Sequence, residues 1–305
     1  MKNRRFLILG ASGFIGKNIV EQLLRTGEEV VSVYNKNSIL DPVKREKAVF
    51  ADLTIVTDIK KLFNEQAYTH VINCMGHVNH VNFLSGGAEV IDQHLISLFH
   101  QFQYINKDTL ESYVYLGSAD EYPVTELKLN ESVREDPRTP YSLSKTAATH
   151  FLQMLHQSEG WPTKIVRVFL TYGPNQNENR FIPSIMKAAS SQGIINTTEG
   201  CQVRDFCYIS DLVKGILNCS LCNDARGEIL NLASGEGIQI RDLVAIIANE
   251  FSVKVNYGVI QQKQGEASMQ VADISKASDI IQWAPSVSLT DGIQRTITAY
   301  KKKYL

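Results

Sequence analysis

The sequence lacks the features that would assign the protein to a membrane, to nucleic acid or to a secretory route. No stretch reaches the roughly 18 apolar residues that a membrane span needs. The N-terminal apolar run stops at Gly10, which is too short for a secretion signal. A formal net charge of -1 gives no reason to expect nucleic acid or an anionic membrane as a partner. We therefore expect a cytoplasmic protein with neither partner.

Cysteine is scarce as well, and its spacing excludes the usual metal sites. Only Cys219 and Cys222 form a C-x-x-C pair among the five cysteines, and no second pair or histidine cluster completes it. We expect no bound metal and interpret the cysteines as reduced, mostly buried thiols. The chain also has no internal repeat or low-complexity segment. What it does have is 305 residues, 44% of them hydrophobic, enough for one large α/β domain with a smaller lobe.

The N-terminal segment has the pattern of a dinucleotide-binding βαβ unit. An apolar strand at 6–9 runs into Gly10, Gly13 and Gly16, an amphipathic helix follows, and 30–34 reads as a second buried strand. Glycines at such a turn let the backbone approach a pyrophosphate, whose charge is met by amides at the helix N-terminus. This context predicts nicotinamide dinucleotide binding, rather than a tight turn of purely structural value.

The residues after the second strand bear on which dinucleotide binds. NAD sites usually carry an acid there for the ribose 2′-hydroxyl, whereas a basic residue suits the 2′-phosphate of NADP. Here Asn35 and Lys36 follow the strand, and no acid occurs before Asp41. We predict NADP(H), with NAD(H) as the alternative. Lys36 could also be an ordinary solvated loop lysine.

Later strand ends predict the rest of the site. The strand at 48–51 ends at Asp52 and Leu53, the strand at 70–74 runs into Met75 and Gly76, and the strand at 112–116 delivers Gly117 and Ser118. In a doubly wound sheet, ligands lie beyond the carboxyl ends of the strands. We expect these segments to line one site.

Tyr141 and Lys145 are four residues apart in a predicted helix that Thr139 can cap. A nearby ammonium favours the phenolate, so we expect a lowered tyrosine pKa and acid–base chemistry near neutrality. One such pair arises easily by chance, and it gains meaning from the nucleotide-binding half before it. The predicted buried stripe of this helix is Leu143, Ala147, Phe151 and Leu155.

The alternation of strands and helices predicts an α/β protein, a Rossmann-like doubly wound parallel sheet with a smaller, irregular α/β substrate lobe at the C-terminus. The regular rhythm ends near residue 174. We place the dinucleotide-binding domain at 1–173, with returning segments near 205–235, and the substrate-binding lobe mainly at 174–305.

The chain resembles the extended short-chain dehydrogenase/reductases, in their group of nucleotide-sugar epimerases, dehydratases and ketoreductases. The resemblance rests on six motifs in their joint order: Gly10-x-x-Gly13-x-x-Gly16, Asp52-Leu53, Gly117-Ser118, Tyr141-x-x-x-Lys145, Arg167 to Tyr172-Gly173-Pro174, and Arg204-Asp205-Phe206-x-Tyr208-x-x-Asp211. It implies hydride transfer between the nicotinamide and a sugar carbon, with Tyr141 exchanging the sugar's proton, Ser118 binding the sugar oxygen and Lys145 tuning the tyrosine.

The resemblance further implies a nucleoside-diphosphate sugar as substrate and a homodimer formed by helices near 90–105 and 141–157. The expected cofactor-binding residues are Gly10, Ser12, Gly13, Phe14, Ile15, Gly16, Asn35, Lys36, Asp52, Leu53, Cys74, Met75, Gly76, Tyr141 and Lys145. The expected substrate-binding residues are Ser118, Asp120, Arg180 and Arg204. For Arg204 the alternative is a structural pair with Asp205.

Four departures from the family pattern narrow the activity. Ala119 stands where dehydratases carry an acid, which disfavours 4,6-dehydration. Leu170 replaces an asparagine that usually touches the sugar nucleotide, and an arginine common before Ala272-Asp273 is missing. His94 replaces a helix asparagine, and we interpret it as a core or dimer-interface residue.

These observations favour an NADP(H)-dependent reductase of a nucleotide-activated 4-keto-6-deoxy sugar, serving deoxysugar and surface polysaccharide biosynthesis such as O-antigen. The alternative is an NAD-dependent C4 epimerase that keeps its cofactor through each cycle. A lesser alternative is a non-catalytic, cofactor-binding scaffold. Such proteins often lose the tyrosine or the lysine, and both are present here.

Overall fold

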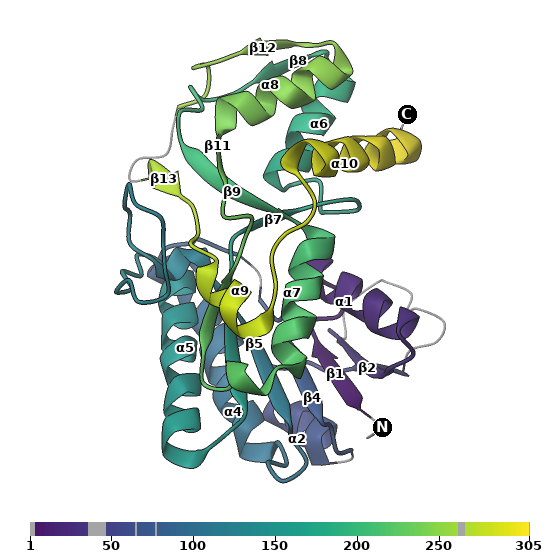
Figure 1. The fold of residues 1–305 in the computed structure, drawn as a ribbon, viewed down its shortest axis with the longest axis vertical. Helices are drawn as coiled ribbons and strands as arrows, with labels where there is room; N and C mark the ends of the chain where they lie inside the picture. Colours follow the sequence, from purple (N-terminus) through teal and green to yellow (C-terminus); the bar gives the residue numbers. More distant parts are fainter. Residues whose placement is uncertain (1–3, 36–46, 65, 77, 262–265, 305) are drawn as a thin grey trace.

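A parallel sheet forms the centre of the molecule in the computed structural model, which describes residues 4–35, 47–64, 66–76, 78–261 and 266–304 (Figure 1). Within those residues the sheet has seven strands in the order β10-β6-β5-β4-β1-β2-β3, all parallel. The strands are β1 (Arg5–Leu9), β2 (Glu29–Tyr34), β3 (Lys47–Phe50), β4 (His70–Asn73), β5 (Ser112–Ser118), β6 (Thr163–Val168) and β10 (Ile229–Leu232). The order 3-2-1-4-5-6 is that of a Rossmann fold, as predicted.

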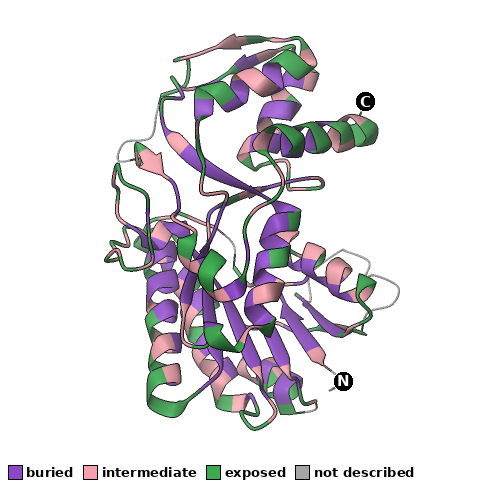
Figure 2. Cartoon of the chain, viewed as in Figure 1, coloured by how far each residue is buried: buried purple, intermediate pink, exposed green. Residues whose placement is uncertain are grey.

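Helices cover both faces of this sheet, because successive strand residues point to opposite sides. On β1, Phe6 and Ile8 join one core with helices α1, α7 and α9, whereas Leu7 and Leu9 join a second core with α2, α4 and α5. All four side chains are at most 1% exposed. The helices are α1 (Phe14–Arg25), α2 (Val56–Asn64), α4 (Ser97–Tyr104), α5 (Pro140–Glu159), α7 (Ile209–Leu221) and α9 (Ser275–Ile281). The buried strands stand out as purple arrows between these layers (Figure 2).

The amphipathic helix expected near 91–102 contains a wider turn. It runs through α3 (Gly87–Ile91), a π-helical turn η2 (Asp92–Ile96) and α4, and a short 3₁₀ turn η1 (Phe83–Ser85) precedes it. Such π turns inside helices are frequent at functional sites. Here the turn carries the buried His94, whose ring packs edge-on against the Tyr141 ring with centroids 5.2 Å apart. His94 is thus a core residue.

Helix α5 is capped as expected, and its buried face matches the prediction only in part. Thr139 Oγ1 accepts a hydrogen bond from the Ser142 amide at 3.1 Å. The predicted buried stripe is confirmed only in part: Leu155 is buried and Phe151 packs partly buried against the same core, but Leu143 is 50% exposed. The buried face also carries Tyr141, Lys145, Ala148 and Leu152. Apolar spacing identified only part of the face because the functional phenol and ammonium are themselves buried.

The C-terminal part adds two small sheets beside the main one. Strand β9 (Val203–Tyr208) pairs with β7, β11 and β13, and β8 pairs with β12. The other elements are β7 (Leu170–Tyr172), β8 (Ile194–Asn196), β11 (Gly237–Gln239), β12 (Lys254–Asn256), β13 (Met269–Gln270), α6 (Phe181–Gln192), α8 (Ile240–Phe251) and α10 (Leu289–Tyr304). Strand β10 and helix α7 lie with the large sheet, although the chain has by then passed through the small one. The domain limits at 173 and 174 stay a prediction.

No helix of the described residues is both long and apolar enough to cross a membrane. Across the same residues, no three His, Cys, Asp or Glu side chains gather in a way that could hold a metal ion. The five cysteines are all free thiols, with Cys207 and Cys219 buried.

Candidate active site

The glycine turn between β1 and α1 is shaped for close approach by a ligand. Gly10 has φ +77°, and a Cβ there would lie 3.0 Å from the backbone of Cys74. A Cβ on Gly16 would come within 2.3 Å of the Gly10 carbonyl oxygen. Helix α1 starts after Gly13 with no side-chain cap and no acid in its first turn. The amides of its first turn, those of Phe14, Ile15 and Gly16, are therefore open to an anion.

This turn lies where the strand order reverses, between β1 and β4. The Cys74 amide donates to the Leu9 carbonyl at 2.9 Å, which joins the two strand ends. Gly76 has φ +139°, and a Cβ there would lie 2.3 Å from the His94 ring. The residues present therefore fit a dinucleotide, whose pyrophosphate would rest on the α1 amides beside Ser12. When bound, that cofactor supplies the hydride donor and acceptor.

The other predicted cofactor residues differ in their burial and in their hydrogen bonds. Asp52 uses one carboxylate oxygen to accept from the Thr54 amide at 3.0 Å and its hydroxyl at 2.7 Å, while Leu53 is buried. Asn35 is exposed at the end of β2, and Lys36 lies outside the described residues. The position predicted to select between the two dinucleotides is therefore not described.

The catalytic candidates Ser118 and Tyr141 meet at the carboxyl end of β5. Ser118 is its last residue, and its Oγ accepts a hydrogen bond from the Asp120 amide at 3.1 Å. Burial raises the pKa of Tyr141 well above its usual value, and the nearby Ser118 side chain lowers it in part. The negative charges of Asp120 and Glu121 also raise the pKa of Tyr141, whereas the positive charge of Arg180 lowers it.

Lys145 does not reverse the rise in the pKa of Tyr141, contrary to the sequence-based expectation of a lowered tyrosine pKa. Its ammonium donates to the Leu116 carbonyl at 2.7 Å and lies 4.6 Å from the centroid of the Tyr115 ring. The Tyr141 centroid is farther, at 5.9 Å. Burial lowers the pKa of Lys145 itself to about 8, against the raising effect of Glu121. In the free protein, Tyr141 is thus a neutral proton donor.

Of the predicted substrate residues, Ser118, Asp120 and Arg180 act on the pKa of Tyr141, whereas Asp120 also acts on the pKa of Arg204. Asp120 pairs with His80 at 2.9 Å, and the His80 ring lies edge-on to Tyr141 with centroids 5.7 Å apart. Arg204 is 8% exposed and pairs with Glu266 at 2.7 Å. Burial lowers the pKa of Arg204, and the carboxylates of Glu266 and Asp120 oppose that shift.

Two of these contacts differ from the sequence-based expectations. Asp205, the pairing partner considered for Arg204, instead accepts hydrogen bonds from the Ser234 hydroxyl and from the amides of Ser234, Gly235 and Ala272. His80 was not predicted, because a single loop histidine has no pattern. Its only indication was its place in the chain, shortly after β4 and before η1.

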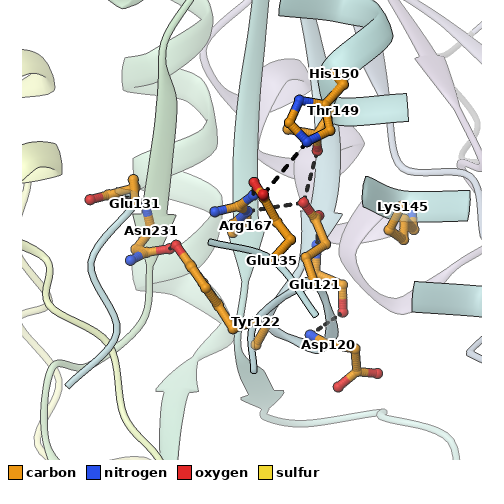
Figure 3. A network of polar contacts seen from close by, with 12 residues as sticks. Asp120, Glu121, Tyr122, Glu131, Glu135, Lys145, Thr149, His150, Arg167 and Asn231 are labelled. Carbon is orange, nitrogen blue, oxygen red and sulfur yellow. Dashed lines mark hydrogen bonds and ion pairs between the residues drawn. The ribbon is translucent and has the colours of Figure 1, made fainter. Parts of the chain in front are cut away.

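A third unpredicted group lies behind Ser118. Glu121, Arg167 and Glu135 form a chain of ion pairs in which the first two side chains are 0% exposed (Figure 3). No sequence pattern indicates that two residues 46 positions apart share a buried pair.

Comparison with known proteins shows which family the chain belongs to. A sequence profile described as the NAD dependent epimerase/dehydratase family matches residues 6–233. The chain is 27% identical to an uncharacterised UDP-glucose epimerase of Bacillus subtilis, covering 98% of this chain and 99% of the relative. It is 25% identical to a UDP-glucuronate 4-epimerase of Thermodesulfobacterium geofontis, covering 97% and 96%. A UDP-glucose 4-epimerase structure from Thermotoga maritima, solved with UDP-glucose, superposes with a TM-score of 0.90 at 18% identity, covering 99% and 100%.

Proposed function

This chain belongs to the NAD dependent epimerase/dehydratase family, and on that basis we propose that it is a nicotinamide-dependent C4 epimerase of a UDP-sugar. The observation that carries the proposal is the placement of Ser118 close enough to Tyr141 to act on its pKa, in a chain that matches two named UDP-sugar epimerases over nearly its full length. These relatives favour the epimerase over the ketoreductase that the sequence alone placed first.

The chain's own residues would do the proton chemistry. Because burial keeps the free phenol protonated, Tyr141 would first release its own proton to solvent. As the phenolate it would take the proton of the sugar 4-hydroxyl as C4 is oxidised, and it would return that proton to the oxygen as C4 is reduced. The Ser118 hydroxyl donates to the same sugar oxygen and so opposes charge build-up on it. Lys145, anchored on the Leu116 carbonyl, holds a positive charge near the phenol. Arg204 and Arg180 are the cations available to the diphosphate, with Arg204 first exchanging Glu266 for phosphate.

A direct assay tests this function. Purified protein is incubated with UDP-glucose or UDP-glucuronate without added cofactor, and the products are identified by NMR. We expect the C4 epimer in each productive case, and NAD released from the protein on acid denaturation. If no epimer forms and the protein instead oxidises NADPH or NADH in proportion to an added 4-keto-6-deoxy sugar nucleotide, the epimerase proposal is wrong and the ketoreductase is correct.

The ketoreductase remains the second candidate because of one observation, the Asn35-Lys36 sequence after β2 in place of an acid. A basic residue there suits the 2′-phosphate of NADP. Measuring Kd for NAD and NADP by calorimetry distinguishes the two cofactors. Deoxysugar and surface polysaccharide synthesis would follow from that activity. If neither epimerisation nor reduction occurs, the cofactor-binding scaffold is the remaining interpretation.

We also propose a homodimer built on α4 and α5. Large apolar side chains remain exposed there, with Leu143 at 50%, Met154 at 45% and Ile96, at the start of α4, at 36%. Phe99 and Phe151 pack against each other between the two helices, with centroids 4.5 Å apart. A second copy would cover this surface.

A further inference from the structure

Glu121 places a carboxylate in the protein interior, directly behind the catalytic serine. Its Oε1 accepts the Ser118 amide at 2.8 Å. Its Oε2 accepts the Thr149 hydroxyl at 2.9 Å and Arg167 Nε at 3.0 Å. The side chains of Glu121 and Arg167 are both 0% exposed. One buried group thus receives hydrogen bonds from three elements (Figure 3).

Each of those elements contributes to the site. Ser118 ends β5, Arg167 belongs to β6, and Thr149 lies on α5 one turn beyond Lys145. Helix α5 also carries Tyr141. The Glu121 carboxylate therefore joins the turn that presents the serine hydroxyl to the helix that presents the phenol and the ammonium.

Two features indicate that the hydrogen bonds of Glu121 fix the positions of neighbouring residues rather than add to the stability of the fold. Gly117 leaves the room that the carboxylate occupies, because a Cβ there would lie 2.5 Å from Glu121 Oε1. A buried ion pair is also a weak source of stability, since well-packed apolar residues of equal volume are often as good or better. The Glu121–Arg167 pair lies beside a candidate catalytic residue and adds little stability, so we infer that it fixes the position of Ser118.

The hydrogen bonds of Ser118 show which geometry is fixed. The Ser118 amide is held by Glu121, and the Ser118 Oγ accepts the Asp120 amide, so both the backbone and the side chain of the serine are fixed beside Tyr141. We propose that Glu121 is a positioning residue that, through the Ser118 amide, holds the Ser118 hydroxyl beside the acid–base tyrosine. The inference rests on the proposed function only in taking Ser118 and Tyr141 as the reacting pair.

Glu121→Gln is the informative variant. The amide keeps the size of the side chain but has one acceptor oxygen instead of two. Charge-assisted hydrogen bonds are about twice as strong as neutral ones, so that oxygen should turn to Arg167. The Ser118 amide then faces an NH2 group and loses its acceptor. Misplacement by about 1 Å can cost roughly 100-fold in rate. We expect kcat to fall about 10- to 100-fold while KM for the UDP-sugar changes little.

Glu135→Gln is the matched control. Glu135 also pairs with Arg167, at 2.5 Å, and no described hydrogen bond joins it to Ser118 or Thr149. Each variant removes one charged partner of the same arginine. The kcat of Glu135→Gln should therefore stay within about threefold of wild type, a range typical of sites that do not couple. Equal losses in the two variants would mean that Glu121 merely supports Arg167.

A double-mutant cycle with Ser118→Ala separates positioning from general loosening. If Glu121 acts through Ser118, Glu121→Gln should lower kcat by less than about threefold when the hydroxyl is already absent. If Glu121→Gln lowers kcat by the same factor in wild type and in Ser118→Ala, the proposal is overturned. Should Glu121→Gln not fold, Thr149→Val takes its place, because it removes one donor and leaves the ion pair intact.

A structural measurement keeps the inference independent of the assigned reaction. Crystal structures of wild type and Glu121→Gln should show the Ser118 hydroxyl leaving Tyr141 in the variant. If wild type turns over no UDP-sugar, the proposed function fails, and these structures still decide the inference. An unchanged distance between the Ser118 and Tyr141 hydroxyl oxygens in Glu121→Gln overturns it.

Discussion

Tyr141 and Lys145 lie on one face of α5 but meet different surroundings. The phenol is in contact with Ser118, and the ammonium is anchored on a β5 carbonyl under the Tyr115 ring. Burial dominates both titrations, raising the pKa of the phenol and lowering that of the amine. The two side chains are therefore better described as separate parts of one site than as a directly coupled pair.

Replacing the Tyr141 phenol tests its proton-transfer role. Tyr141→Phe should reduce turnover by about 100-fold or more, the contribution of a general acid–base group, because phenylalanine has no hydroxyl to exchange the proton. Cofactor affinity should stay within a few-fold, as measured by calorimetry. Tyr68→Phe, at the opposite end of the sheet, is the matched control and should have wild-type rates. Unchanged turnover in Tyr141→Phe would contradict the mechanism.

The depressed pKa of Lys145 predicts an alkaline limit to activity. The charged amine is lost as pH rises through about 8, well below its ordinary value of 10.5. The profile of kcat/KM reports ionisations of the free enzyme, so it should fall above about pH 8. A profile that stays flat to pH 10 would show that the charge on Lys145 is not required.

At the scale of elements, the β1–α1 turn and helix α5 carry the two halves of the site. The turn depends on glycine for steric reasons, and α5 depends on its cap and on its buried polar face. Each therefore predicts a specific consequence of substitution.

Gly16→Ala should abolish dinucleotide binding. Its new methyl group would lie 2.3 Å from the Gly10 carbonyl oxygen, so the turn must open and the first-turn amides of α1 must move. Calorimetry with NAD and NADP measures the loss, and circular dichroism checks that the fold is retained. Wild-type affinity in this variant would show that the turn does not hold the pyrophosphate.

The exposed face of α5 predicts how the protein associates. Leu143→Glu should convert a dimer to a monomer in analytical ultracentrifugation, because a charge would be buried against a second copy. Leu127→Glu is the control, since Leu127 is 74% exposed and lies between the 3₁₀ turn η3 (Ala119–Glu121) and α5. A wild type that sediments as a monomer would rule out this dimer.

For the molecule as a whole, a buried histidine links stability to pH. His70 begins β4 and is 4% exposed, and burial lowers its pKa to about 4 from the usual 6.5. The unfolded chain therefore binds a proton between pH 6.5 and 4 that the folded protein does not. The contribution of neutral His70 to the free energy of unfolding is fully present above pH 6.5 and is lost as pH falls towards 4.

The size of that effect can be measured by urea unfolding. At 1.36 kcal/mol per pKa unit, His70 costs the folded state up to about 3 kcal/mol by pH 4. We expect the free energy of unfolding to fall between pH 7 and pH 5 in wild type, and to fall less in His70→Gln. Equal slopes in the two proteins would place the pH dependence in other groups.

The sequence predicted those features of the structure that depend on neighbouring residues in the chain, and it missed those that depend on tertiary contacts. The glycine turn, the alternation of strands and helices and the cap at Thr139 all follow from short patterns, because each local pattern favours one conformation. The association of Ser118 with Tyr141 was implied by family resemblance, and their joint role in catalysis stays a prediction. The buried face of α5 was predicted only in part, because apolar spacing cannot show that a phenol and an amine are buried.

The sequence by itself thus determined the fold class, the family and the three residues proposed for catalysis. Tertiary structure decided their electrostatics. Desolvation, which dominates the pKa of both Tyr141 and Lys145, depends on everything packed around them. It also decided the neighbours that no local pattern contains, such as His80 on Asp120 and Glu121 behind Ser118. Contacts between residues far apart in the chain exist only once the sheet has brought its strand ends together.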